Sequence, residues 1–441
     1  MLREYQARLY RATGEAFKQG YKRPLVVAPC GAGKSYIFLE MARNCPGQVL
    51  VLVHRRELLN QHKLLFQREG ITNARVEMVF TEVNHMTERG RPNLLILDEA
   101  HLSRSNTWMT VIEHYDTYTV GFTATPVRLD SKPLGSIFDT LIQGVTVPWL
   151  IQNKYLAEFD YYAPVTIDVS KARVSNGEFV QSDLATIMGN KAIYGDVVRA
   201  YKEIAHGKKA IAYCVSVEHA KQVAQQFRDA GYPATYLAAE TPNARRDQVM
   251  SEFRNGWYKV LCNVGIISEG ISIDDVMCCL LLRPTQSHAL YWQQAMRCLR
   301  YQDGKRAMIL DFVGNYTRNP MPDDDVVWSL ESVPPKPKRM TDSGDFTVRV
   351  CPECYRTFKT ASRCPYCGAE YPLTRREIEA REDVELRRIA QEDKERIAQE
   401  KKRLRQEVGQ AKTFAELLKI ASARGYKRSW AMMVWRGRQR N

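Results

Sequence analysis

Glycine, lysine and serine residues at 28–35 are arranged in a way that suits phosphate binding. The segment lies between an apolar run at 25–27 and a helical pattern at 35–43. Glycines 31 and 33 let backbone N–H groups wrap an anion without Cβ clashes, and the following helix N-terminus adds a favourable partial charge. Lys34 can reach the β- and γ-phosphates of a nucleotide, and the Ser35 hydroxyl can bind Mg²⁺. The alternative is an ordinary strand–helix turn containing Gly-Lys-Ser by chance. The segment reads Ala28-Pro29-Cys30-Gly31-Ala32-Gly33-Lys34-Ser35.

Two adjacent carboxylates, Asp98 and Glu99, follow the apolar run at 94–97 and precede His101. The carboxyl ends of strands in an α/β sheet are where active sites form. Asp98 can hold Mg²⁺ through its coordination shell, and Glu99 can orient and deprotonate an attacking water. His101 could couple this edge to a second domain. Acidic turns are common, so the pair becomes specific only because a phosphate-binding segment precedes it.

Four cysteines form two C-x2-C pairs, Cys351 with Cys354 and Cys364 with Cys367. Each pair makes a knuckle whose thiolates point to one ion, and two knuckles complete a tetrahedron. The pattern predicts a structural Zn²⁺ site; iron or redox-active cysteines are the alternatives. Four other cysteines read as buried or incidental thiols: Cys30, Cys214, Cys262 and Cys298.

The elements that position these residues alternate apolar strands with helical segments. In the first half, strands are expected at 25–28, 49–53, 76–80, 94–97 and 119–122. The pattern becomes irregular at 147–162, where we expect a domain junction, and then restarts. Further strands are expected at 210–215, 234–237, 260–262, 277–282 and 307–310, with helices at 218–230 and from the cap Thr241 to 255. This alternation indicates two parallel α/β domains.

The chain has 441 residues and a formal net charge of +14, with 44% hydrophobic and 26% charged residues. Its length allows two or three domains, and its charge favours a polyanionic partner such as nucleic acid, although simple solubility charge is the alternative. No apolar run reaches membrane-spanning length and the N-terminus resembles no signal peptide, so we expect the cytoplasm of a bacterial or phage-infected cell and no membrane partner.

Composition changes sharply after the second domain. The run 333–339 is rich in proline and basic residues, and residues 374–408 contain neither glycine nor proline. Charge pairs four residues apart favour a solvated helix over a coiled coil there, although both remain open. The end combines Tyr426, Trp430 and Trp435 with basic residues, which suits nucleic-acid contact or a small self-packed helical hairpin. The expected parts are domains 1–155 and 156–325, a linker 326–350, a zinc module 351–370, a charged helix 371–408 and a basic helical tail 409–441.

Several segments together resemble superfamily 2 helicases of the DEAD/DEAH type. The phosphate-binding segment, Asp98 to His101 and Thr123 to Pro126 resemble motifs I, II and III in order. Residues 51–59 resemble motif Ia, 263–271 motif V, 293–300 motif VI and 2–6 the adenine-reading glutamine segment. The runs 283–287 and 311–315 look like phage and prophage helicases, and the whole is closest to their DNA-directed, XPB-like and restriction-motor branch.

The resemblance implies two tandem RecA-like domains and a set of residue roles. ATP, Mg²⁺ and Zn²⁺ are the implied cofactors. Lys34, Asp98, Glu99, Arg297 and Arg300 would be catalytic. Nucleotide contacts would come from Arg3, Gln6, Pro29, Cys30, Gly31, Ala32, Gly33, Lys34, Ser35, Glu269 and Gly270. Coupling would involve His101, Thr123, Thr125 and Gln293, and nucleic acid would contact His54, Arg55 and Arg56. Ser35 and Asp98 would hold Mg²⁺.

Three positions depart from the family pattern. Met296 replaces a glycine before the first motif VI arginine, Ser272 replaces an acidic residue of motif V, and Thr123 replaces a serine in motif III. Thr123 and the histidine of motif II argue against the DEAD-box RNA helicases.

The expected activity is ATP-dependent movement on or unwinding of DNA, whether single-stranded, forked or branched. The alternatives are an RNA helicase, or an ATP-gated nucleic-acid clamp that recruits a replication or repair protein through 351–441. We expect a monomer or a weak oligomer.

Overall fold

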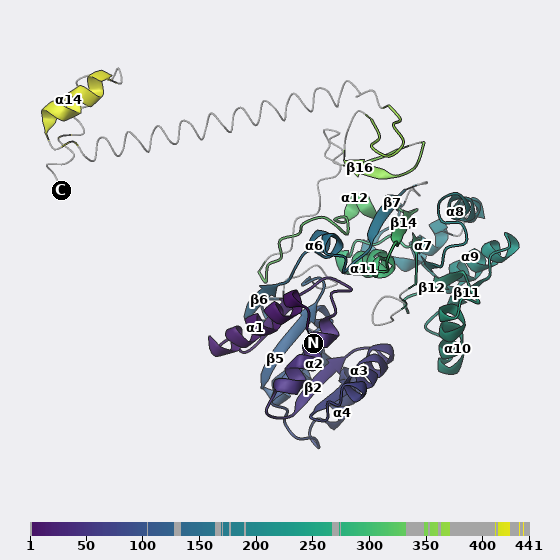
Figure 1. The fold of residues 1–441 in the computed structure, drawn as a ribbon, viewed down its shortest axis with the longest axis horizontal. Coiled ribbons are helices and arrows are strands. Elements are labelled where there is room, and N and C mark those ends of the chain that lie inside the picture. Colours follow the sequence, from purple (N-terminus) through teal and green to yellow (C-terminus); the bar gives the residue numbers. More distant parts are fainter. Residues whose placement is uncertain are drawn as a thin grey trace. The chain divides into compact units, whose positions relative to one another are not determined.

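The chain divides into two units in the computed structural model (Figure 1). One unit comprises Met1–Arg339 and Thr347–Glu370, and the other Met340–Phe346 and Tyr371–Asn441. The structure describes residues 2–103, 105–127, 134–163, 169, 171–175, 178–188, 191–266, 273, 275–331, 348–351, 353–359, 363–370, 411, 413–423, 432 and 435. The basic run 333–339 and the charged segment 371–408 therefore lie outside the described residues.

The first domain is built on a six-stranded sheet whose order is β3-β2-β4-β5-β1-β6. Every neighbouring pair of strands is parallel. Its strands are β1 Pro24–Val27, β2 Val49–Val53, β3 Ala74–Met78, β4 Leu94–Asp98, β5 Tyr118–Thr123 and β6 Thr140–Gln143. Its helices are α1 Glu4–Lys18, α2 Lys34–Asn44, α3 Arg56–Arg68, α4 Val79–His85, the 3-10 turn η1 Ala100–Leu102, α5 Asn106–Tyr115 and α6 Val147–Gln152.

Both faces of the first sheet are covered, which explains why strands β1 and β2 are apolar at every position. Alternate residues such as Val26 and Ile96 pack in one cluster with α1, α2 and α3. The intervening residues, such as Leu25 and Leu97, pack in another cluster with α4 and α5. This arrangement leaves the loops after the carboxyl ends of the strands as the place where polar side chains gather.

The second domain has the same plan, with a parallel sheet in the order β11-β12-β10-β13-β14-β7. Its strands are β7 Glu158–Tyr162, β10 Ala210–Tyr213, β11 Ala234–Leu237, β12 Val260–Asn263, β13 Cys278–Leu281 and β14 Arg306–Asp311. Its helices are α7 Gln181–Met188, α8 Lys191–Ile204, α9 Val217–Asp229, α10 Asn243–Arg254, α11 His288–Ala295, the 3-10 turn η2 Met296–Leu299 and α12 Asn315–Arg318. A short hairpin joins β8 Val174–Ser175 to β9 Glu178–Phe179.

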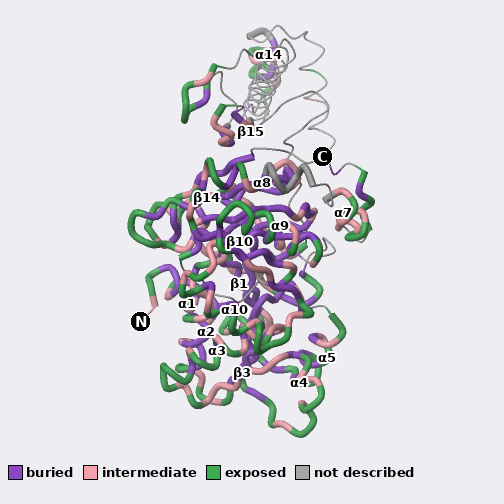
Figure 2. The backbone as a smooth tube through the Cα atoms, turned by 90° about the vertical axis from the view of Figure 1, so that its right-hand side faces the viewer, coloured by how far each residue is buried: buried purple, intermediate pink, exposed green. Residues whose placement is uncertain are grey.

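Figure 2 shows the backbone buried along β1 and β10, which are interior strands of the two sheets. Helices α8 and α9 cover one face of the second sheet, and α10 and α11 cover the other. The structure therefore confirms the prediction of two tandem RecA-like parallel sheets. Among the described residues, no helix is long and apolar enough to cross a membrane.

Two stretches differ from the sequence expectations. The expected strand 76–80 ends at Met78, because Val79 begins α4 and is buried against α5. The expected irregular junction 147–162 instead contains α6 and the edge strand β7. The sequence carried a signal for α6: Thr146 caps it by accepting from the Trp149 N–H at 3.4 Å, and Pro148 lies in its first turn. Thr241 does not cap α10, which begins at Asn243.

Residues at both ends of the expected linker 326–350 make specific contacts with the rest of the protein. Trp328 packs edge-on against Trp292 at a ring-centroid distance of 5.9 Å, and the carbonyl of Leu330 accepts from the Gly135 N–H at 2.8 Å. Strand β15 Val348–Val350 pairs in antiparallel fashion with β16 Thr357–Lys359. The cysteine-bearing module therefore begins before Cys351.

The second unit has one described helix, α14 Phe414–Ala423. Leu417 and Ala421 of this helix form a small apolar cluster with Ala411 and Trp435. The rings of Phe414 and Trp435 lie 6.2 Å apart. For Trp435, this packing favours the self-packed alternative over base stacking.

Candidate active site

The phosphate-binding segment leaves β1 and enters α2 at Lys34. Gly31 and Gly33 have φ angles of +83° and +72°, which residues with a Cβ rarely adopt. Gly33 is the N-cap of α2, so the N–H groups of the first turn face the segment. The Lys34 ammonium lies 3.4 Å from the Ala28 carbonyl oxygen, folded back along the loop. The local fold is therefore that of a phosphate cradle.

Asp98 ends β4 and is held by hydrogen bonds to both carboxylate oxygens. Oδ1 accepts from the Glu99 N–H at 3.0 Å, and Oδ2 lies 2.9 Å from Nε2 of His62 in α3. Burial tends to raise the pKa of the Asp98 carboxyl, but the His62 hydrogen bond and the nearby His62, Lys34 and His54 groups lower it overall. A charged, oriented carboxylate fits a role in holding Mg²⁺. His62 had no signal in the sequence beyond being a histidine in a helical pattern.

Next to Asp98, residues of motifs II and III contact one another. Glu99 has a φ of +53°, a strained conformation for a residue with a side chain. Its Oε2 lies 3.5 Å from Nδ1 of His101, and that nitrogen lies 3.2 Å from Oγ1 of Thr123. The Thr123 hydroxyl donates to the Thr125 carbonyl at 2.9 Å. The structure thus joins Glu99 to the loop after β5 through a continuous polar chain.

A cleft of about 880 Å³ is lined by residues of both domains, including the groups described above. The first domain contributes Cys30, Gly31, Gly33, Lys34, Ser35, Asp98 and Glu99 to its lining. The second domain contributes Gln293, Met296, Arg297 and Arg300. Met296 is buried in the domain core at the start of η2, so the position that departs from the family pattern is a packing residue that also reaches the cleft. The Leu299 carbonyl accepts from the Ala157 N–H at 2.8 Å, which fixes the backbone next to Arg300.

The glutamine segment lies against the phosphate cradle. The Gln6 amide donates to the Ala32 carbonyl at 2.9 Å and accepts from the Arg3 N–H at 3.0 Å. The Arg3 guanidinium lies 4.4 Å from the ring centroid of Tyr155. Tyr155, which follows α6, was missed by sequence reasoning because the stretch around it was read as irregular. The guanidinium and the ring are in direct cation–π contact, which holds Arg3 beside the Gln6 segment.

His54, Arg55 and Arg56, which are expected to contact nucleic acid, directly follow β2. Their surroundings differ. Arg55 donates from Nη1 to the carbonyls of Gly265 and Ile266 in the second domain, at 2.9 and 3.0 Å, and from Nε to His54 at 3.1 Å. Arg56 is exposed at the start of α3. Arg55 is therefore an interdomain contact in this structure. Glu269 and Gly270, expected to contact nucleotide, lie outside the described residues.

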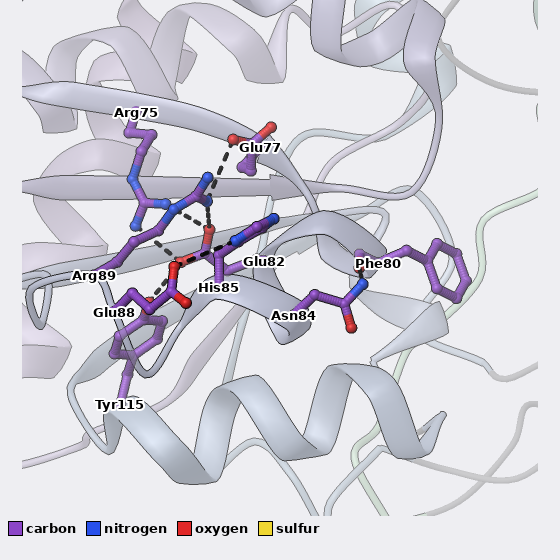
Figure 3. A network of polar contacts seen from close by, with 9 residues as sticks. All are labelled: Arg75, Glu77, Phe80, Glu82, Asn84, His85, Glu88, Arg89 and Tyr115. Carbon is purple, nitrogen blue, oxygen red and sulfur yellow. Dashed lines mark hydrogen bonds and ion pairs between the residues drawn. The ribbon is translucent and has the colours of Figure 1, made fainter.

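Helix α4, beside motif Ia, is fixed by a buried ionic network that the sequence did not reveal (Figure 3). The Glu82 side chain is fully buried and accepts hydrogen bonds from Arg75, Arg89 and Tyr115. In Figure 3 these side chains converge on Glu82, whereas Phe80 points away from them. The anchor holds the turn that follows β3, next to the turn that carries His54 and Arg55, because Val53 and Met78 are paired in the sheet.

The four cysteines converge at one point. Their sulfur atoms all lie within 4.8 Å of one another, with Cys351 and Cys367 at 3.5 Å and Cys354 and Cys364 at 3.8 Å. A tetrahedron with Zn–S bonds of about 2.3 Å has sulfur–sulfur edges of about 3.8 Å. The cluster therefore fits zinc.

The cysteine module is docked on the edge strand β7. Arg356 donates from Nε to the Tyr162 hydroxyl and from Nη2 to Asp160 Oδ2, both at 3.0 Å. The Ala163 N–H donates to the Tyr355 carbonyl at 3.0 Å, and the Thr357 hydroxyl donates to the Tyr161 carbonyl at 3.1 Å. The module is thus joined to the second domain by both backbone and side-chain contacts.

Comparisons with known proteins agree with this geometry. Residues 194–302 match the family described as helicase conserved C-terminal domain, and residues 1–88 and 71–128 match type III restriction enzyme, res subunit. A 51.5 kDa protein of Lactococcus phage (isolate 7-9) is 37% identical over 386 residues, covering 86% of this chain and 85% of the relative. The DNA 3'-5' translocase XPB2 of Sulfurisphaera tokodaii is 21% identical, covering 71% of this chain and 81% of the relative.

Three further similar proteins are longer than this chain. The IRC3 proteins of Saccharomyces cerevisiae and Schizosaccharomyces pombe are 27% and 29% identical over 71% and 72% of this chain, which spans 52% and 58% of their lengths. The ATP-dependent type ISP restriction-modification enzyme LlaBIII, solved bound to DNA, shares the fold with a TM-score of 0.54 at 16% identity, over 71% of this chain and 28% of that one.

Proposed function

Because this chain belongs to the superfamily 2 helicases of the restriction-motor and XPB-like type, we propose that it is an ATP-dependent DNA helicase or translocase of phage or bacterial replication, recombination or repair. The observation that carries the proposal is the interdomain cleft, which joins Lys34 and Asp98 of one domain with Arg297 and Arg300 of the other. Phosphoryl transfer depends on positioning and charge stabilisation, and a site divided between two domains makes both depend on closure.

The first domain supplies the binding half of the chemistry. The backbone around Gly31 and Gly33 cradles the phosphates, and Lys34 extends to the β- and γ-phosphates. Ser35 and Asp98 would hold Mg²⁺, which neutralises phosphate charge when it is bound. Glu99 orients and deprotonates the attacking water, and its contact with His101 ties this step to the loop after β5.

The second domain supplies the charges that complete the site. Arg297 and Arg300 stabilise the negative charge that builds up during transfer, as arginine fingers do in related chemistry. Hydrolysis removes the phosphate that these arginines grip, so the cleft can reopen. If both domains hold one nucleic-acid strand, each cycle of closing and opening moves the protein along it.

Several observations support DNA as the nucleic acid along which the protein moves, and the cytoplasm of a bacterial or phage-infected cell as its location. The chain carries a net charge of +14, which suits a polyanion. One relative is a phage protein, another is named as a DNA translocase, and a structure of the same fold is of an enzyme bound to DNA. We propose in addition that Cys351, Cys354, Cys364 and Cys367 bind one structural Zn²⁺.

Strand displacement tests this function directly. The full chain is incubated with ATP and a forked DNA duplex, a DNA triplex or an RNA duplex, with Lys34→Ala as the inactive control. A helicase separates the fork, whereas a translocase that does not unwind displaces only the third strand of the triplex. Activity confined to the RNA duplex would make the protein an RNA helicase, and nucleic-acid-stimulated ATP hydrolysis without any displacement would make it a clamp.

A further inference from the structure

Helix α3 carries a histidine, His62, whose side chain contacts Asp98 of the candidate ATP site. The helix starts at Arg56, directly after the segment that contacts the second domain, and His62 lies in its second turn. The His62 side chain is 1% exposed, and its Nε2 atom lies 2.9 Å from Oδ2 of Asp98. Motif comparison gives this residue no role, because it follows the motif Ia segment 51–59.

The geometry around His62 shows an oriented ring. Its ring packs edge-on against Phe38 of α2 at a centroid distance of 5.5 Å. The Nδ1 atom is buried and has no hydrogen-bond partner among the described residues. A carboxylate can only accept, so a proton on Nε2 of the imidazole makes this contact a hydrogen bond. Packing on one side and Asp98 on the other thus define both the ring position and its tautomer.

The carboxylate of Asp98 is in turn held in one rotation. Oδ1 accepts from the Glu99 N–H, and Oδ2 accepts from His62, so each oxygen retains one lone pair, and Asp98 lines the cleft. Without the second hydrogen bond, only the Glu99 N–H would restrain rotation of the carboxylate about its χ2 angle. Groups that orient a metal-binding carboxylate in this way typically change metal affinity or activity by about 10- to 100-fold when they are removed.

We propose that His62 is a positioning residue for the ATP site, and that its Nε2–H donates to Asp98 and holds that carboxylate in the orientation needed to bind Mg²⁺ with ATP. The inference rests on the proposed function, because it assigns Asp98 to the magnesium of a hydrolysed nucleotide. The competing explanation is that His62 only fills the space between α2 and α3.

Two substitutions separate these explanations. His62→Leu introduces an apolar side chain of similar bulk and removes the donor. His62→Gln keeps an N–H donor near the position of Nε2. The matched control is His85→Leu in α4, where a half-exposed histidine contacts the exposed Glu88. Circular dichroism and thermal unfolding of the full chain establish that each variant is folded.

The decisive readout is the Mg²⁺ concentration that half-saturates binding of a fluorescent non-hydrolysable ATP analogue, measured beside kcat and KM for ATP. We expect His62→Leu to raise that concentration about 10- to 100-fold, His62→Gln to remain within about threefold of the wild type, and His85→Leu to be unchanged. A folded His62→Leu protein with wild-type Mg²⁺ dependence would overturn the proposal, as would equal loss in the leucine and glutamine variants.

A third variant tests the same proposal if His62→Leu does not fold. His62→Asn has a donor too short to reach Oδ2, so it should show the same increase in the Mg²⁺ requirement, and a wild-type requirement would again overturn the proposal. Because the analogue is not hydrolysed, the measurement also remains valid for a protein that binds ATP without moving on DNA. Failure of the proposed function and failure of this inference are therefore distinguishable.

Discussion

Glu57 in α3 and Arg246 in α10 lie 3.1 Å apart across the domain interface, although 189 positions separate them in the sequence. Both side chains are mostly buried, at 23% and 18% exposure. Together with Arg55, this pair ties the start of α3 to the second domain. The helix that touches the second domain is therefore the same helix that lines the nucleotide cleft and bears His62.

A double-mutant cycle measures what this ion pair contributes to closure. Glu57→Ala and Arg246→Ala should each lower kcat/KM for ATP, because each weakens the arrangement that brings the arginines to the cleft. The double variant should be no worse than the more impaired single variant, which corresponds to a coupling of about 1 kcal/mol, or about fivefold in kcat/KM. Fully additive losses would show that the two side chains act independently.

Substitution of Arg297 should separate hydrolysis from binding. Arg297→Ala removes a charge supplied by the second domain, so kcat should fall by about 10³-fold. Binding of the ATP analogue should remain within a few-fold of wild type, since the first domain holds the phosphates. Lys34→Ala should impair both, and Lys202→Ala, on the surface of α8, should impair neither. A normal kcat in Arg297→Ala would remove the second domain from the chemistry.

The sequence predicted the sheets and the cleft for a clear physical reason. Unbroken runs of valine, leucine and isoleucine specify strands buried on both faces, and in parallel sheets the motifs that follow them meet at one edge. The order of the motifs was therefore sufficient to bring Lys34 and Asp98 together. The partnership with Arg297 followed from family resemblance and not from any local pattern.

Other features left no local signal. His62 looks like any residue on a helix face, and its contact with Asp98 depends on how α3 packs. Arg356 meets Asp160 and Tyr162 only because the cysteine module adds to the edge of the second sheet. Composition suggested a tethered module, whereas the contacts across β7 join it to the second domain. Long-range pairings of this kind are fixed by topology.

The Glu82 network should make the stability of the first domain depend on pH. Burial acts to raise the pKa of the Glu82 carboxyl, but hydrogen bonds from Arg75, Tyr115 and Arg89 lower it below its ordinary value of 4.5. A lowered pKa in the folded state adds stability that is present above pH 4.5 and is lost as the pH falls through the folded-state value.

Glu82→Gln tests that network by urea unfolding at a series of pH values. At pH 7 the variant should lose about 3 kcal/mol, because two partly buried guanidinium groups lose their fully buried carboxylate partner. The deficit should shrink as the pH falls below 4.5, because the Glu82 carboxyl of the unfolded wild-type chain takes up a proton there before that of the folded protein does. Glu88→Gln, at an exposed site nearby, is the control and should unfold like the wild type. A deficit that does not vary with pH would contradict the ionic origin.

Metal removal should lower the thermal stability of the second domain as well as that of the cysteine module. We expect about one zinc per chain by atomic absorption and a lower melting temperature after chelation or in Cys364→Ser. Arg356→Ala should lower the melting temperature by about 2–6 °C through loss of the contacts with Asp160 and Tyr162. Arg363→Ala breaks an exposed pair with Glu370 in the same module and should have almost no effect. Equal shifts in the two arginine variants would argue against the docking.

The central claim is that DNA controls ATP hydrolysis in the interdomain cleft, and the most direct test is steady-state ATP hydrolysis by the full chain with and without nucleic acid. Single-stranded DNA, duplex DNA and RNA are compared at equal nucleotide concentration and low salt. We predict at least tenfold stimulation by DNA, greater than that by RNA, and none in Arg297→Ala. An ATPase rate that no nucleic acid changes would contradict the account.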